Sequence, residues 1–205
     1  RLIRRAEADV IVGRKLAELC LSGLSALRRD FIFALKLLDP LILAETKSLI
    51  LLDSDVITYR RPEQLLSSIT ACFMPDNRYA YCVPESIFKE IAATSNLIYM
   101  NAGLLKVWPA QISLQQLEQD LTSLQTQSVG NAPDFYTEQT LWALQLHRLG
   151  AAALSHSGIC YGPGDGSSIT GHFCGGGYWA SLIYTEAIPH VYHDALRLGL
   201  TNDSP

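Results

Sequence analysis

Two aspartates separated by one residue, Asp53 and Asp55, have the type and spacing that most directly suggest chemistry. They follow the apolar run 48–52, which predicts a buried strand of a mostly parallel sheet. Two carboxylates at a strand end can converge on one divalent cation, and Mg²⁺ or Mn²⁺ prefers such ligands together with phosphate oxygens. Ligands of open α/β sheets bind at this edge, so we expect a metal site there. The structural alternative is a polar strand end that only begins a turn.

The rest of the sequence alternates between patterns typical of helices and of strands, which predicts an α/β fold. In the last predicted helix, Thr137 is a candidate N-cap and Gly150 a candidate C′ residue. The glycine-rich stretch 162–177 is the one long loop, and such loops are often functional. The patterns predict helices over 24–44, from 61 onward, over 113–127 and over 137–149, and strands over 48–52, 78–83 and 96–100.

Composition limits the class of protein. At 205 residues the chain is long enough for a single domain, 1–205, in which the segment 1–23 has no clear assignment. Apolar residues make up 48% and charged residues 18%, which favours a packed core over disorder. The net charge of −4 comes without a block of Lys and Arg. Because affinity for phosphate backbones comes from clustered cations, nucleic acid is not an expected partner.

The cysteines and the apolar runs bear on location. The five cysteines form no C-x-x-C pair, so a reducing, cytoplasmic compartment is the simpler interpretation. No run of about 18 apolar residues occurs, so no membrane span is expected, while peripheral association and the oligomeric state stay open. The first residue is Arg, and we expect the chain to begin partway through a longer protein.

The stretch LILLDSDVITYRRPEQLL resembles the D-x-D strand of glycogenin-like and lipopolysaccharide-glycosyltransferase-like sequences, and FALKLLDPL resembles the helix before it. Three further resemblances follow in the family's order: Asn101-Ala102-Gly103 to its N-x-G turn, Glu138-Gln139 to its acidic-Gln pair, and the segment 172–175, HFCG, to its H-x-x-G metal loop. The resemblance covers roughly residues 24–180. It implies the A-type glycosyltransferase fold, with a Rossmann-like, mostly parallel sheet flanked by helices.

The resemblance also implies an activity. It suggests a metal-dependent, retaining transfer of a hexose from a nucleotide diphosphate sugar, a UDP-sugar by resemblance, to a saccharide or lipid-linked acceptor, with Mn²⁺ or Mg²⁺ as cofactor. It implies metal ligation by Asp53, Asp55 and His172, donor contacts from Ser54, Asn101, Gly103 and Gly175, and catalytic roles for Glu138 and Gln139. Lys36, a lone cation on an apolar helix face, is a candidate donor contact or else extends to solvent. The alternatives for the other residues are a plain turn at Asn101 and Gly103 and a favourable interaction of Glu138 with its helix dipole.

Two departures from the family support an alternative. Only 52 residues precede Asp53, so the first βα units, which bind the nucleoside, are expected to be missing or reduced. The metal loop continues with Gly177-Tyr178-Trp179 in place of the family's Lys-Pro-Trp, which removes a cation that contacts the diphosphate. The alternative is therefore a truncated or catalytically inactive glycosyltransferase-like domain with a binding role.

Other functions use some of the same residues. A nucleotidyltransferase would also use carboxylates and a metal, but no basic glycine-rich phosphate loop precedes Asp53. Tyr178, Trp179 and Tyr184 are a candidate platform for the acceptor, although aromatic residues on a helix are more often core. A zinc site is a further alternative, although its ligand spacings are unusual; it would combine His156, Cys160, His172 and Cys174.

Overall fold

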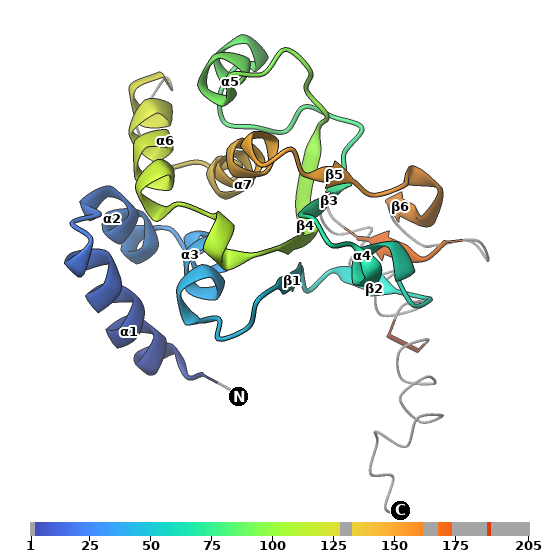
Figure 1. Cartoon of the computed structure of the whole chain (residues 1–205), viewed down its shortest axis with the longest axis horizontal. Coiled ribbons are helices and arrows are strands. Elements are labelled where there is room, and N and C mark those ends of the chain that lie inside the picture. Colours follow the sequence, from blue (N-terminus) through green and yellow to red (C-terminus); the bar gives the residue numbers. More distant parts are fainter. Residues whose placement is uncertain (1–2, 128–132, 162–167, 174–187, 190–205) are drawn as a thin grey trace, which may run out of the picture.

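The computed structural model describes residues 3–127, 133–161, 168–173 and 188–189 (Figure 1). Within these residues the α-helices are α1 (Arg5–Glu18), α2 (Ser22–Asp30), α3 (Ala34–Leu43), α4 (Glu63–Ser67), α5 (Glu85–Ala92), α6 (Leu114–Gln127) and α7 (Thr137–Arg148). The strands are β1 (Leu49–Leu52), β2 (Val56–Thr58), β3 (Cys72–Pro75), β4 (Met100–Val107), β5 (Ala152–Ala153), β6 (Ile159–Tyr161) and β7 (Thr170–His172), and two short 3₁₀ turns lie at Pro109–Gln111 and His156–Gly158. The predicted α/β class is confirmed.

The strands form two small mixed sheets, one in the order β1-β4-β3-β5 and one in the order β2-β7-β6. Among the described residues, β4 pairs antiparallel with both β1 and β3, and β2 pairs antiparallel with β7. Parallel pairing is limited to β3 with β5 and β6 with β7. The predicted mostly parallel, Rossmann-like sheet is therefore not confirmed. An apolar run such as 48–52 indicates burial and not strand direction.

Strand β4 is the centre of the larger sheet and is buried along its whole length. Because side chains alternate between the two faces of a strand, Leu105 and Val107 enter the main core while Leu104 enters a second, smaller cluster. Figure 1 shows α1, α2, α3 and α6 on one side of this sheet and α4 with the second sheet on the other. Strand β4 is thus covered on both faces.

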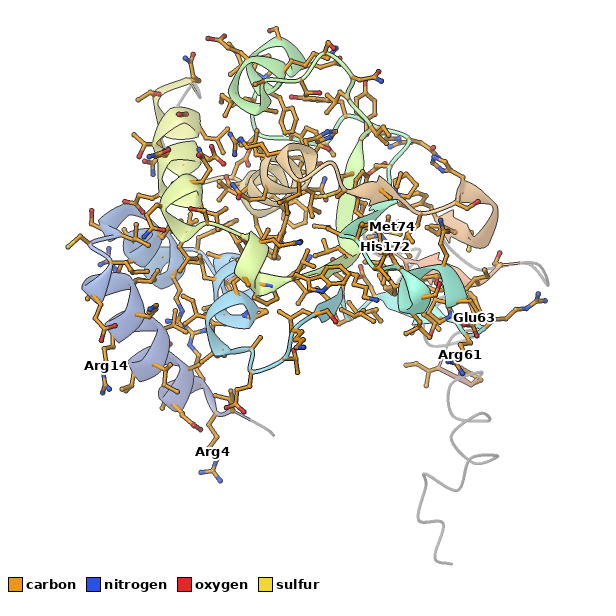
Figure 2. The ribbon with its side chains drawn as sticks, viewed as in Figure 1. Arg4, Arg14, Arg61, Glu63, Met74 and His172 are labelled. Carbon is orange, nitrogen blue, oxygen red and sulfur yellow. The ribbon has the colours of Figure 1, made fainter. Side chains whose placement is uncertain are left out.

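The amino-terminal segment 1–23, which has no assignment from the sequence, contributes α1 to this main core. Val12 and Leu16 are fully buried there. The polar side of α1 faces outward: Figure 2 shows Arg4 and Arg14 projecting from this end of the molecule, far from His172. In the described part of the chain, no helix has the length and apolarity needed to cross a membrane.

Several element predictions are confirmed and others need correction. The helices predicted over 113–127 and 137–149 are α6 and α7, and Gly150 follows α7 in the left-handed conformation, with φ of 61°. Thr137 is the first residue of α7 and not its N-cap, which is Tyr136; the Thr137 hydroxyl instead accepts the Asp134 N–H at 2.9 Å. The single helix predicted over 24–44 is two helices, because the chain turns at 31–33. Apolar periodicity does not reveal such a turn.

The strands predicted over 78–83 and 96–100 are also wrong, apart from Met100, the first residue of β4. Within the segment 78–83, Tyr81 and Val83 are buried by packing and not by strand pairing, while Arg78 is exposed. The Tyr81 ring stacks on Phe88 of α5 at 4.6 Å between centroids, and its hydroxyl accepts the Met100 N–H at 2.7 Å. The apolar, strand-like pattern of this segment therefore reflects burial and not strand formation.

The burial of strand β1 and the extent of the glycine-rich loop both differ from the sequence predictions. Strand β1 lies at an edge of its sheet, and Ile50 and Leu52 are 41% and 47% exposed. The sequence predicts full burial of this strand. The predicted loop 162–177 contains β7, while its parts 162–167 and 174–177 lie outside the described residues. The prediction that 1–205 form one domain stays a prediction.

A buried charged network joins α6 to α7. The Asp120 carboxylate, 2% exposed, accepts hydrogen bonds from Arg148 at 2.7 Å and from Gln145 at 2.7 Å. Arg148 also donates to the carbonyl of Ile91, at the end of α5. Because a buried carboxylate is costly without a partner, this network fixes how α7 lies against α5 and α6.

We expect the change Arg148→Ala to lower the free energy of unfolding by about 3 kcal/mol, because it leaves the buried Asp120 carboxylate without its cation. Urea denaturation followed by circular dichroism measures this. Arg29 is the matched control, since its ion pair with Asp30 is exposed and Arg29→Ala should cost less than about 1 kcal/mol. Equal losses in the two variants would contradict the role of the network.

Candidate metal centre

Antiparallel pairing of β1 with β4 brings two sequence motifs together. Leu52, the last residue of β1, pairs with Leu104, and the next backbone N–H, that of Asp53, donates to the Gly103 carbonyl at 2.8 Å. Asp53, the first residue of the acidic pair, therefore lies opposite the segment Asn101-Ala102-Gly103. The sequence predicts a turn for these three residues, whereas they lie inside β4, next to an irregularity in its pairing with β3.

The second sheet supplies the histidine. Val56 of β2 pairs with His172 of β7, and the Phe173 N–H donates to the Asp55 carbonyl at 2.9 Å. The His172 side chain is 4% exposed, and its Nε2 lies 3.4 Å from Asp55 Oδ1. His172 therefore faces Asp55 because β7 pairs with β2, directly after the acidic pair.

Gly103 has no side chain and so leaves room for the His172 ring. A Cβ atom at position 103 would lie 2.7 Å from His172 Cε1 and 2.9 Å from Asn101 Oδ1, closer than side chains approach. The Asn101 Oδ1 atom accepts the Gly103 N–H at 2.8 Å. Gly103 is thus needed for close approach, and its predicted role as a direct donor contact stays a prediction.

Asp53, Asp55 and His172 each offer a ligand atom, and these atoms lie within 4.8 Å of one another. In the described part of the chain, no other group of three His, Cys, Asp or Glu residues has this arrangement. The buried Nδ1 of His172 has no hydrogen-bond partner there. Two carboxylates and an imidazole suit Mn²⁺ or Mg²⁺ when phosphate oxygens complete the shell, so the residues fit the predicted ion.

The pKa values of Asp55 and Glu138 are shifted in opposite directions. His172 beside Asp55 holds the pKa of that carboxyl below its ordinary value, and burial opposes the shift. The Lys36 Nζ lies 2.6 Å from Asp53 Oδ1 and 3.6 Å from Glu138 Oε1. Burial, with the Asp53 charge, raises the pKa of Glu138 to about 7, and Lys36 opposes this. Asp55 is therefore ionised at neutral pH, while Glu138 is partly protonated there.

Gln139 connects the site to the fold. Its Oε1 accepts the Ala102 N–H at 3.2 Å, and its Nε2 donates to the Ala80 carbonyl at 2.8 Å. These bonds attach α7 to β4 and to the segment after β3. In that segment Asp76 Oδ2 accepts a hydrogen bond from Asn101 Nδ2 at 3.2 Å. The amide of Gln139 is thus occupied in positioning the site, and a catalytic role for it stays a prediction.

One cavity of about 850 Å³ contains this constellation. Gly103 supports the wall, and Gly175 lies outside the described residues. The cavity also exposes residues that the sequence analysis missed. Asp76 had a detectable signal, since it ends an apolar run as Asp53 does. The predicted residues that line the cavity are Lys36, Asp53, Ser54, Asp55, Asn101, Glu138, Gln139 and His172, and the missed ones include Phe33, Asp76, Arg78, Phe135, Tyr136 and Tyr161.

The zinc alternative gains no support from the described residues. His156, Cys160 and His172 do not form a group of metal ligands there, and Cys174 lies outside the described part. The Cys160 Sγ instead lies 3.5 Å from the Thr170 carbonyl. The candidate acceptor platform at 178, 179 and 184 also lies outside the described residues.

Comparison with known proteins returns no match: no family model, no curated protein and no solved structure matches this chain. The candidate function therefore depends on the geometry of the site and on the motif-level resemblance.

We expect Gly103→Ala to weaken Mn²⁺ binding at least about tenfold, although Gly103 offers no ligand, because the new methyl group would displace the His172 ring. Isothermal titration with MnCl₂ measures this. Gly13 on α1 is the control, since a Cβ there meets nothing within 4 Å, and Gly13→Ala should leave the affinity unchanged. Unaltered Mn²⁺ affinity in Gly103→Ala would remove His172 from the ligand set.

Glu138 should make stability depend on pH. Its pKa in the folded chain, about 7, lies above the ordinary value of 4.5, so the folded state retains the proton that the unfolded state loses. Stability should therefore fall as the pH rises from about 4.5 through 7, by at most about 3 kcal/mol. Glu138→Gln should remove this fall, measured by urea denaturation in EDTA between pH 4.5 and 8. The exposed Glu63, changed to Gln, is the control. An undiminished fall in Glu138→Gln contradicts the assignment.

Proposed function

We propose that this chain is a metal-dependent glycosyltransferase that moves a hexose from a nucleotide diphosphate sugar, preferably a UDP-sugar, to a saccharide or lipid-linked acceptor. The observation that carries the proposal is the convergence of Asp53, Asp55 and His172 within 4.8 Å in a cavity of about 850 Å³. The three ligands come from motifs that occur in the order of the resembled family. A cavity of this size suits a nucleotide sugar.

The surrounding charges support an anionic, phosphate-bearing ligand. Asp53 and Asp55 would hold the divalent cation, whose chemistry is to neutralise charge on the departing diphosphate. Lys36, paired with Asp53, adds a positive charge in the same wall. Arg78, an exposed residue of the cavity lining, can also reach an anionic ligand from solvent. These two cations support the proposal in a chain whose metal loop lacks the family's lysine.

The remaining polar groups suit a sugar. Asp76 and Asn101 form a bonded pair in the cavity lining and can accept and donate hydrogen bonds to hydroxyl groups. Glu138 holds its Oε1 buried near Lys36, and in its protonated form it can donate to a sugar oxygen. A retaining outcome, the role of Gln139, an A-type fold and a cytoplasmic location remain proposals based on the resemblance.

A donor panel tests the proposal. We expect Mn²⁺-dependent binding and slow hydrolysis of one UDP- or GDP-sugar, measured by calorimetry and nucleotide release. Asp55→Ala should weaken UDP with Mn²⁺ at least about tenfold, because it removes a ligand and a negative charge. Asp30→Ala, which removes an exposed carboxylate from α2, is the control.

The outcomes separate the candidate functions. Failure to bind any donor would refute the proposal. Binding without nucleotide release, even with a panel of acceptors, would favour the inactive domain with a binding role. Undiminished affinity in Asp55→Ala would place the metal elsewhere.

A further inference from the structure

Three aromatic side chains form a cluster where the cavity opens to solvent. Phe33 precedes α3, Phe135 and Tyr136 precede α7, and all three line the cavity. Phe33 and Phe135 meet edge to face at 5.0 Å between centroids, and Phe135 and Tyr136 do so at 5.4 Å. We call these three residues the aromatic rim.

The aromatic rim continues directly into the charged part of the site. Phe33 lies three residues before Lys36, Tyr136 lies two residues before Glu138, and all four residues line the same cavity. The Lys36 Nζ in turn contacts Asp53 of the candidate metal centre at 2.6 Å. A ligand held at the metal would therefore have the rim beside it.

Packing alone does not account for the aromatic rim. The exposed fractions of Phe33, Phe135 and Tyr136 are 40%, 66% and 42%. The exposed part of a ring contributes no hydrophobic stabilisation, and clustered exposed apolar groups are typical of binding sites. The rim thus has the character of a ligand surface.

We propose that the aromatic rim is the saccharide subsite of the cavity, on which the C–H face of an acceptor sugar ring packs. This inference rests on the proposed function, in which the metal centre takes the donor. Aromatic faces attract the weakly positive C–H groups of a sugar ring, and the hydroxyls at its edge need polar partners. Asp76 and Arg78 supply them nearby, because Gln139 attaches the segment after β3 to the beginning of α7.

Two other ligands fit the rim less well. A lipid chain needs a continuous apolar groove, whereas the cavity beyond the rim is lined by charged side chains such as Lys36, Asp53 and Arg78. A nucleobase favours a narrow slot in which both of its faces are covered, whereas Phe135 is 66% exposed. The open, polar surroundings favour a saccharide that extends into solvent.

The test uses the full chain and ligand-observed NMR titrations with maltohexaose, cellohexaose and lactose, without donor. Phe135→Ala should weaken the best of these at least about fivefold, and Phe135→Trp should retain binding. The affinity for UDP with Mn²⁺ should stay within about twofold. Ile32→Ala is the matched control, since Ile32 is also 66% exposed and neighbours Phe33 but does not line the cavity. A melting curve for each variant verifies the fold.

Each outcome decides for or against the saccharide subsite. The inference fails if the parent binds none of the three saccharides, or if Phe135→Ala binds them as tightly as the parent. It also fails if Phe135→Ala weakens UDP and spares the saccharides, which would identify a nucleobase site. If saccharides bind in a Phe135-dependent manner but no donor binds, the proposed function fails and the subsite stands.

Discussion

The close approach of the His172 ring to Gly103 is the constraint on which the rest of the site depends. The Asp53 N–H donates to the Gly103 carbonyl, and the Gly103 N–H donates to Asn101 Oδ1. One glycine of β4 therefore contacts groups from the end of β1, from β7 and from its own strand. A Cβ atom at this position would meet the His172 ring and the Asn101 amide, so a side chain there would displace groups of the site.

Among the described residues that line the cavity, carboxylates outnumber cations. Asp53, Asp55 and Glu138 all line the cavity. In the described part of the chain the Lys36 ammonium lies within ion-pair distance of Asp53 and Glu138, while Asp55 lies beside His172. Burial leaves Glu138 as the carboxyl that retains its proton most readily. His172 holds the pKa of the Asp55 carboxyl below its ordinary value, so Asp55 stays ionised, and a bound cation would compensate its charge. Gathering carboxylates in this way lowers the free energy of unfolding when the cation is absent.

Much of the helical structure is predictable from the sequence, because amphipathic periodicity reports local geometry. Helices α6 and α7 match their predicted ranges closely, and β1 lies where its apolar run predicts it. Strand direction and pairing were not predictable, because an apolar run is the same in a parallel and in an antiparallel sheet. The segment 78–83 likewise has a strand-like pattern without forming a strand, since its buried Tyr81 packs on Phe88 of α5.

The sequence by itself determined which residues are candidate metal ligands, because Asp53, Asp55 and His172 are recognisable from residue type and from the order of weak motifs. Only the tertiary structure decided how they meet. Antiparallel pairing sets Asp53 against Gly103, and β7 pairs beside β2 to deliver His172. The tertiary structure also decided the aromatic rim. Phe33 and Phe135 lie about a hundred residues apart, and contacts at that separation leave no local pattern in the sequence.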